Sequence, residues 1–366
     1  MKARAAILRA SPAPAPYNLT EPLSVEEVEL DAPGPNEVLI KIDVAGICHS
    51  DLSVIDGTRH RPLPMALGHE AAGHILVIGD DVSSVRQGDR VVTTFLPRCG
   101  SCAACLSTTP RPCLPGTQAN TRGELLGGGR RITSRHGPVH HHLGVSAFAT
   151  HAIVDERSLV RVDPDVPPDV AALLGCAVLT GGGALLNAAR PENGETITVV
   201  GLGGIGMAAA LVAIALGYTV YGVDRLGPKR STAAALGLTR AFDPDEAREA
   251  NHTSDIVIEA VGRATALETA IDLTAAGGRT VTVGLPSPTE RAAISPLDLT
   301  TQSRSIIGSY LGSSHPARDI PRYVELWRSG RLPIERLVTH RNTLDQINDA
   351  VEELRTGTGI RHIITP

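Results

Sequence analysis

The stretch from Cys48 to Glu70 holds a thiol, an imidazole and a carboxylate, which are the side-chain types that bind zinc in proteins. A catalytic zinc ion takes three protein ligands and keeps a fourth position open for water or substrate. Cys48 and His69 supply two such ligands. Four of the six cysteines cluster elsewhere, which leaves Cys176 as the candidate for the third. Any one of these residues alone would be an ordinary buried side chain, so the metal assignment depends on their combination.

A second group of thiols has the spacing Cys-x2-Cys-x2-Cys-x7-Cys and consists of Cys99, Cys102, Cys105 and Cys113. Four thiolates close a tetrahedral site completely, which predicts a structural zinc ion. An iron–sulfur cluster is the first alternative, but its bacterial motif places the fourth cysteine after three residues and directly before a proline. Here seven residues intervene, and Leu114 separates the last cysteine from Pro115. Disulfides are the second alternative, and a reducing compartment disfavours them.

A glycine-rich turn follows a buried-strand pattern at 196–200 and precedes an alanine-rich helix that runs to Leu216. A second strand pattern at 218–223 ends at Asp224. The turn itself is Gly201-Leu202-Gly203-Gly204-Ile205-Gly206. A lone GxGxxG is a weak signal, whereas strand, glycines, helix, strand and terminal acid together predict a dinucleotide-binding unit.

Each part of this unit has a physical task. Gly201 permits the tight turn, Gly203 lets a pyrophosphate approach the backbone, and Gly206 lets the helix press on the strand. The phosphates would then lie at the positive N-terminus of the helix. Asp224 would accept hydrogen bonds from ribose hydroxyls and repel a 2′-phosphate, which favours NAD, although the neighbouring Arg225 is a side chain that a 2′-phosphate would attract.

Length and composition limit the remaining possibilities. A chain of 366 residues predicts two domains. A net charge of -5, no dense run of Lys or Arg, and only three Phe, five Tyr and one Trp argue against a nucleic-acid partner. The apolar stretch at the start is too short for a signal peptide, and we expect no membrane span. A cytoplasmic setting follows as the expectation.

The elements that must position these groups show two secondary-structure patterns, one in the first part of the chain and one later. Alternating apolar residues at 38–44 predict a strand that leads into Cys48, and short apolar runs near 75–78 and 90–93 continue a mostly β domain. We expect residues 115–143, including His140-His141-His142, to form a solvated or interdomain loop rather than a third metal site.

Later in the chain, strands and helices alternate, which indicates a doubly wound parallel sheet. Thr343 and Gln346 form a capping-box pattern that opens a helix to Arg355, and 360–364 is a final strand that we expect to rejoin the first domain.

Together these motifs resemble the zinc-dependent medium-chain alcohol dehydrogenase family over nearly the whole chain, and the segment ending His142-Leu143-Gly144 is similar to its long-chain animal-type and class III branch. The resemblance implies an α/β fold with a GroES-like catalytic domain at 1–177 and 320–366 and a Rossmann domain at 178–319. It also implies two zinc ions per chain, NAD as cofactor, an alcohol and its aldehyde or ketone as substrates, and a homodimer.

The resemblance also assigns roles to residues of this sequence. Cys48, His69 and Cys176 would bind catalytic zinc, Glu70 would approach the metal, and Asp51 would orient His69. Ser50 would hydrogen-bond the substrate oxygen, and the pocket wall would include Phe95 and Phe148. Cofactor contacts would be made by His49, Thr180, Gly201, Gly203, Gly204, Ile205, Gly206, Asp224, Arg225, Lys229 and Arg361.

Two departures from the family pattern bear on function. Ser53 stands where many relatives have a histidine that completes a proton relay, and Leu114–Gln118 offers no arginine where class III relatives hold the glutathione carboxylate. The missing arginine argues against oxidation of a thiol adduct of formaldehyde, which stays an alternative activity, as does a nicotinoprotein that never releases its cofactor. A non-enzymatic zinc protein is a further hypothesis, against which the complete ligand set argues.

Overall fold

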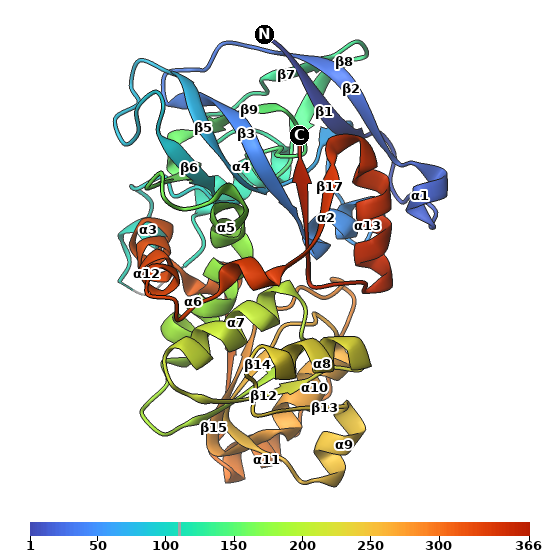
Figure 1. Ribbon diagram of the computed structural model, residues 1–366, viewed down its shortest axis with the longest axis vertical. Helices are drawn as coiled ribbons and strands as arrows, with labels where there is room; N and C mark the ends of the chain where they lie inside the picture. The colour runs from blue at the N-terminus through green and yellow to red at the C-terminus, as the bar shows by residue number, and fades with distance from the viewer. Residues whose placement is uncertain (109–110) are drawn as a thin grey trace. The chain divides into compact units, whose positions relative to one another are not determined.

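The computed structural model describes residues 1–108 and 111–366, and within them the chain forms two compact units (Figure 1). Met1–Cys176 and Val338–Pro366 form the first unit, and Ala177–Leu337 forms the second. The predicted return of the C-terminal tail is therefore observed from residue 338 onward, not from residue 320.

Residues 320–337 belong to the second unit because α12 (Pro316–Arg328) packs on α6 (Leu179–Gly183), an apolar helix of that unit. A Cβ atom added at Gly182 of that helix would lie 2.6 Å from the Tyr323 ring. Asn187 donates a hydrogen bond of 3.0 Å to Asp319. The amphipathic helix thus buries its apolar face within the second unit.

Two sheets build the first unit. The strands of the closed barrel are, in order, β1 (Lys2–Leu8), β2 (Leu23–Leu30), β7 (Ile132–Ser134), β8 (Gly137–His141) and β4 (Met65–Ala66). The other sheet has the order β10 (Leu159–Val162), β6 (Arg90–Thr93), β5 (Glu70–Ile78), β3 (Glu37–Ile47), β18 (Arg361–Thr365) and β17 (Val338–Thr343), with β9 (His151–Asp155) paired to β3. The predicted alternation in β3 places Val38, Ile40 and Ile42 in the hydrophobic core.

The helices of the first unit are mostly short. They are α1 (Tyr17–Thr20), α2 (His49–Ile55), α3 (Ala103–Leu106), α4 (Leu114–Arg122), η1 (Glu156–Ser158), α5 (Pro168–Leu173), η6 (Leu344–Gln346) and α13 (Ile347–Thr356). The predicted capping box is confirmed, because Thr343 and Gln346 exchange side-chain and backbone hydrogen bonds at the start of η6.

The histidine-rich segment differs from the predicted solvated loop. It contains β7 and β8, and β8 pairs with both β7 and β4 to close the barrel. His141, at the end of β8, and His142, directly after it, are both buried. The prediction failed because burial here depends on strand pairing with distant segments.

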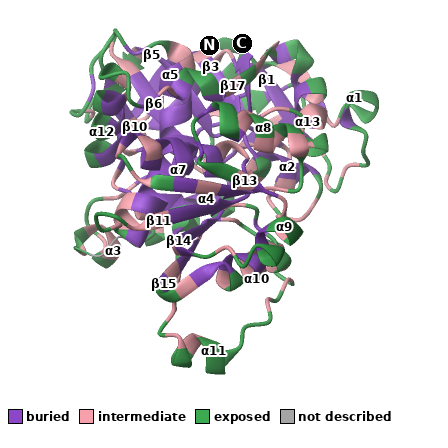
Figure 2. Cartoon of the chain, turned by 60° about the horizontal axis from the view of Figure 1, so that its bottom comes forward, coloured by how far each residue is buried: buried purple, intermediate pink, exposed green. Residues whose placement is uncertain are grey.

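A six-stranded parallel sheet forms the centre of the second unit, as predicted. Its strands are, in order, β13 (Arg240–Phe242), β12 (Thr219–Val223), β11 (Thr196–Val200), β14 (Ser254–Glu259), β15 (Thr274–Thr282) and β16 (Ser305–Gly308). The other elements include α7 (Gly204–Ala215), α8 (Gly227–Ala235), α9 (Pro244–Glu249), α10 (Ala264–Asp272), α11 (Pro296–Thr301), η4 (Tyr310–Ser313) and η5 (Ile334–Leu337). Figure 2 shows strands β11 and β14 as buried, whereas α11 has no buried residue.

One apolar helical stretch runs from Pro168 to Ala189 and includes η2 (Leu174–Val178), α6 (Leu179–Gly183) and η3 (Ala184–Ala189), with η2 and η3 in the wider π-helical form. By length and composition it could cross a membrane, but 89% of its most apolar window is buried. The buried core helix of a protein can have the same length and apolar composition as a membrane-spanning helix.

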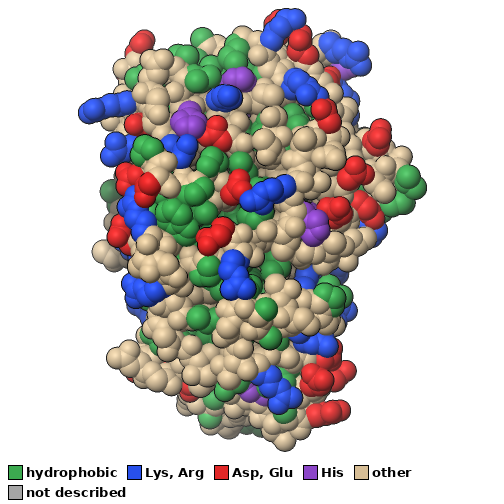
Figure 3. Space-filling model, in the orientation of Figure 1, with side chains coloured by type: hydrophobic (Ala, Val, Ile, Leu, Met, Phe, Trp, Pro, Cys, Tyr) green, Lys and Arg blue, Asp and Glu red, His purple; other side chains and the backbone are tan. Residues whose placement is uncertain are grey.

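On the face drawn in Figure 3, acidic and basic side chains are interspersed.

Candidate active site

The three predicted ligands of the first metal site converge in the first unit. Cys48 follows β3 and begins α2, His69 directly precedes β5, and Cys176 lies in η2. The Cys176 sulfur lies 3.6 Å from His69 Nε2, and the ligand atoms of all three residues lie within 4.8 Å of one another. All three side chains are buried.

This geometry fits a zinc ion. Zinc–sulfur and zinc–nitrogen distances of about 2.3 and 2.0 Å at a tetrahedral angle place the two ligand atoms about 3.5 Å apart. The observed 3.6 Å between Cys176 Sγ and His69 Nε2 matches that separation. Two thiols and one imidazole leave one tetrahedral position for water or substrate.

Asp51 organises the first site through hydrogen bonds from three directions. Its Oδ2 accepts from the Cys48 backbone N–H at 3.0 Å, and its Oδ1 accepts from Gly68 N at 3.2 Å and lies 3.0 Å from His69 Nδ1. Because a carboxylate oxygen only accepts, His69 Nδ1 carries the proton and Nε2 presents its lone pair toward Cys176. The structure thus places Asp51 where the predicted orienting role requires it.

Charges around this site shift several pKa values. Burial alone would raise the pKa of Asp51, but His69 and His142 outweigh it and hold that pKa well below its ordinary value. Burial alone would lower the pKa of His69, and Asp51 reverses that effect and raises it. The hydrogen bond between the two thiols lowers the pKa of Cys48 and raises that of Cys176, so the first thiolate forms on Cys48.

Glu70 and Arg361 form an ion pair beside the ligands. Both side chains are buried, and Glu70 Oε1 has no hydrogen-bond partner among the described residues. Burial and the nearby Cys48 raise the pKa of Glu70 against the opposing effect of Arg361. The predicted contact of Arg361 with a pyrophosphate remains a prediction; within the first unit, its guanidinium pairs with Glu70.

Cys176 depends on the glycine that precedes it. A Cβ atom added at Gly175 would lie 1.9 Å from the carbonyl oxygen of Thr93, at the end of β6. Only glycine lets the helical backbone approach the strand this closely. The close approach therefore sets the depth at which the third ligand lies.

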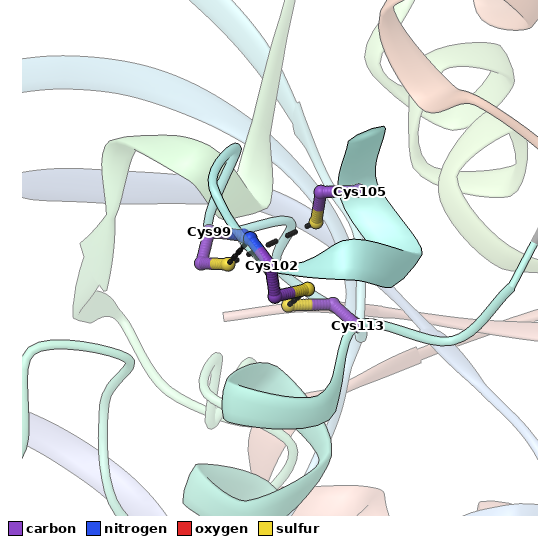
Figure 4. A group of neighbouring side chains, drawn as sticks. All are labelled: Cys99, Cys102, Cys105 and Cys113. Atoms are coloured by element: carbon purple, nitrogen blue, oxygen red, sulfur yellow. Dashed lines mark hydrogen bonds between the residues drawn. The ribbon is translucent and has the colours of Figure 1, made fainter. Parts of the chain in front are cut away.

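The four-cysteine lobe, residues 99–113 with 109–110 outside the described part, brings its sulfurs together as predicted (Figure 4). The Cys99 and Cys105 sulfurs are 3.9 Å apart, and those of Cys102 and Cys113 are 4.0 Å apart. Tetrahedral zinc with four sulfurs at about 2.3 Å requires separations near 3.8 Å. All six cysteines are free thiols, so the disulfide alternative does not fit.

Backbone groups support the lobe. Burial of Cys99 is outweighed by N–H groups from Ser101 and Cys102, which lower the pKa of this thiol to about 6. The Arg98 guanidinium donates to the carbonyl oxygens of Ala104, Cys105 and Arg111 at 3.3 to 3.4 Å. Local backbone contacts thus favour the thiolate of Cys99, whereas burial raises the pKa values of the Cys105 and Cys113 thiols.

Other predicted residues of the first site divide by location. Ser50 and His49 lie in the first turn of α2, and Phe95 places its ring edge-on to His69 at 5.6 Å between centroids. Phe148 is fully buried in the hydrophobic core, and its predicted place in a pocket wall stays a prediction. The Ser53 hydroxyl donates to the His49 carbonyl at 2.9 Å.

In the second unit, the glycine-rich turn joins β11 to α7 as predicted. Gly201 has φ +94°, and a Cβ atom at Gly206 would lie 1.8 Å from the Gly201 carbonyl oxygen. A Cβ atom at Gly203 would meet nothing within 4 Å, so the space above this residue is open. Gly204 and Ile205 form the first turn of α7, where backbone N–H groups point toward that space.

Asp224 follows β12 and binds backbone on both sides. Its Oδ2 accepts from Leu202 N at 2.8 Å, and its Oδ1 accepts from Leu226 N at 2.9 Å. The carboxylate therefore fixes the glycine-rich turn and retains lone pairs for a ribose hydroxyl. Arg225 is exposed beside it, and Arg230 donates to the carbonyl oxygens of Asp224 and Arg225 at 2.8 and 2.9 Å.

Two other predicted cofactor residues also lie in the second unit. Lys229 is half-buried in α8, and Thr180 is buried in α6. Their contacts with a nucleotide stay predictions.

Sequence reasoning missed Glu259, which ends β14. Its Oε1 accepts from Val261 N and Gly262 N at 2.7 Å, and its Oε2 accepts from the Thr282 hydroxyl at 2.6 Å. It therefore ties the turn after β14 to the last residue of β15, at the carboxyl ends of parallel strands where such sheets bind ligands. An acid ending a strand, as at Asp224, was the available signal.

The second missed residue is His142, whose Nδ1 lies 3.1 Å from Asp51 Oδ1. Asp51, His69 and His142 form a third buried group of potential ligands among the described residues. No sequence signal separated His142 from its two histidine neighbours.

Comparison with known families and structures assigns both units. Residues 34–164 match the alcohol dehydrogenase GroES-like domain, and residues 204–328 match the zinc-binding dehydrogenase domain. The predicted fold class, a GroES-like domain with a Rossmann parallel sheet, is thereby confirmed.

Solved structures of similar proteins cover the whole chain. A benzyl alcohol dehydrogenase from Acinetobacter calcoaceticus is 28% identical, with TM-score 0.91 and coverage of 100% of this chain and 99% of that one. A cobalt- and zinc-bound thermostable alcohol dehydrogenase from Pyrobaculum aerophilum is 28% identical, with TM-score 0.79 and full coverage of both chains.

An alcohol dehydrogenase zinc-binding domain protein from Burkholderia ambifaria is 31% identical, with TM-score 0.92 and coverage of 100% of this chain and 99% of that one. Identity at this level over the full length, together with both domain matches, shows that this chain belongs to the zinc-dependent medium-chain alcohol dehydrogenase family.

Proposed function

We propose that this protein is an NAD-dependent alcohol dehydrogenase that interconverts an alcohol and its aldehyde or ketone. The observation that carries the proposal is the buried convergence of Cys48, His69 and Cys176, with Asp51 bound to the far nitrogen of His69. Zinc at these ligands would supply a Lewis acid that lowers the pKa of an alcohol, and NAD would accept hydride.

The remaining steps belong to the chain itself. Asp51 keeps the proton of His69 on Nδ1, so that Nε2 stays available as a ligand. Ser50 receives the proton that the alcohol loses and passes it on. Ser53 cannot act as the base because its hydroxyl is neutral and donates to the His49 carbonyl. The onward route therefore runs through water or the ribose hydroxyls.

Aromatic primary alcohols are the first substrates to test, because one of the similar structures is a benzyl alcohol dehydrogenase. Thiol adducts of formaldehyde rank second. Leu114 is exposed after the last lobe cysteine, and no arginine occurs in 114–118 to hold a glutathione carboxylate.

NAD is proposed over NADP because Asp224 stands beside the glycine-rich turn and would repel a 2′-phosphate. We also propose a cytoplasmic homodimer, as the animal-type and class III branch suggests. Light scattering would then give twice the 38.3 kDa of one chain.

The test of the proposed function combines metal analysis with NADH absorbance for benzyl alcohol, aliphatic and secondary alcohols, and the formaldehyde–glutathione adduct. We expect two zinc ions per chain and turnover of at least one simple alcohol with NAD. A protein with two zinc ions that oxidises none of these alcohols with either free nucleotide contradicts the proposal, unless a nucleotide survives gel filtration and identifies a nicotinoprotein.

A further inference from the structure

The carboxylate of Asp51 faces two imidazoles, although orienting one metal ligand requires only one contact. His69 Nδ1 lies 3.0 Å and His142 Nδ1 lies 3.1 Å from the same oxygen, Oδ1. Asp51 is fully buried, and the two histidine side chains are 1% and 2% exposed. A buried carboxylate is costly unless several donors surround it, so the second imidazole has an electrostatic reason to be there.

His142 is held in place independently of Asp51. Its backbone N–H donates to the Ser146 hydroxyl at 3.0 Å, and its carbonyl accepts from Val145 N and Ser146 N. Leu143 and Ser146 in this turn have φ values of 51° and 59°, which non-glycine residues rarely adopt. The turn therefore fixes the backbone of His142 directly after β8.

The protons of the cluster follow from its chemistry. Because Asp51 Oδ1 only accepts, the Nδ1 atom of His69 carries a proton toward it. The His69 contact is an aligned hydrogen bond, whereas His142 Nδ1 lies 3.1 Å from the same oxygen without hydrogen-bond alignment and contacts Asp51 through charge and dipole alone. His142 also packs edge-on to the His69 ring, with 5.4 Å between centroids.

We propose that His142 is a positioning residue of the metal centre, which through Asp51 and the His69 ring holds His69 in its metal-binding orientation. The inference rests on the metal site proposed above. It predicts that His142 determines how firmly the first zinc ion is retained, without touching that ion.

The test is the rate at which a chromogenic chelator removes zinc. Wild-type protein should release zinc in two phases, and Cys48→Ser should lack the phase that belongs to the first site. Loss of a partner behind a ligand typically costs ten- to a hundredfold in metal affinity. Since Asp51 keeps three other donors, we expect the lower end for His142→Phe, about tenfold faster release from the first site and unchanged release from the lobe.

Two variants separate positioning from simple packing. His142→Asn retains an N–H near the position of Nδ1 and should restore slow release. His141→Phe is the matched control, since His141 is also buried in this segment but accepts from Arg131 N at 3.0 Å. It should leave both release phases unchanged.

A double-mutant cycle tests whether the effect passes through Asp51. Adding His142→Phe to Asp51→Asn should change zinc release less than about twofold, because the shared acceptor is already altered. Independent effects that multiply would overturn the inference, as would wild-type zinc release by His142→Phe alone.

A third metal equivalent that disappears in His142→Phe would also overturn the inference and identify a separate site. Wild-type protein that binds only one zinc ion would instead count against the proposed function.

Discussion

Cys48, His69 and Cys176 lie within or directly beside three different elements, whereas the four lobe cysteines lie within one short segment. The side chains of Cys48, His69 and Cys176 are all buried. The lobe cysteines lie on a partly exposed segment, and its helix α3 has no buried residue. Fold geometry therefore holds the first set of ligands, and local backbone together with the metal holds the second.

The same cysteine-to-serine substitution at both metal sites tests most directly whether the two sites are held in these different ways. Cys48→Ser replaces a thiolate ligand by a poorly binding hydroxyl of similar size, and should lower kcat/KM for alcohol oxidation by about a thousandfold or more. Zinc content should fall from two ions to one. Thermal unfolding should stay near that of the wild type, because the surrounding core remains intact. A variant with near-normal turnover would show that Cys48 is not a ligand of the reacting centre.

Cys105→Ser should give the opposite pattern. We expect loss of the lobe zinc, cleavage by protease within 99–113, and a melting temperature lower by roughly 5 to 10 °C for a loss of a few kcal/mol. Alcohol oxidation by the folded fraction should be largely retained below that temperature. The comparison fails if this variant loses turnover while its proteolysis and melting are unchanged.

The glycine-rich turn and Asp224 extend the comparison to the second unit, because these residues, like the lobe cysteines, lie close together in the sequence. Asp224→Gly should raise the ratio of NADP to NAD use by about tenfold to a hundredfold, because it removes a charged acceptor beside Arg225. Steady-state kcat/KM with each nucleotide measures the ratio.

Asp224 also anchors Leu202 and Leu226, so absolute rates with both nucleotides should fall. Asp224→Asn serves as the control because it keeps the size of the side chain and removes only its charge. An unchanged preference in both variants would mean that Asp224 does not face the ribose.

The smallest expected effect concerns the proton route from the first site. Ser53→His would introduce an imidazole of ordinary pKa about 6.5 near the start of α2. A relay member one step from the substrate should raise single-turnover alcohol oxidation by about tenfold at most, and more at pH ~7 than at pH ~9. A deuterated alcohol verifies that hydride transfer is observed. If the ratio of neutral to alkaline rates stays constant while the isotope effect persists, another group carries the proton.

Local patterns were the part of this molecule that sequence reasoning could predict. The lobe sulfurs and the turn at 201–206 are each specified within a few residues, and both have the predicted geometry. The three distant ligands were found through zinc chemistry and the family resemblance, and the fold then placed them together.

The missed features depend on packing between distant segments. His142 comes near Asp51 only when β8 pairs with β4 and closes the barrel. The second domain boundary moved from 320 to 338 because the partner of α12 is a glycine-lined helix more than a hundred residues earlier. The spacing of apolar residues in the sequence identifies the apolar face of a helix but does not identify the element that packs against that face.

Gly175 gives the first metal centre a sensitivity that no ligand substitution reveals. Metal–ligand distances tolerate errors of about 0.2 Å, whereas a methyl group at this position would have to move the helix by more than an ångström to escape the Thr93 carbonyl at 1.9 Å. The thiol of Cys176 would be carried outward with it. The depth of the third ligand is thus set by a hydrogen atom on the neighbouring backbone, at a residue that would itself bind no metal.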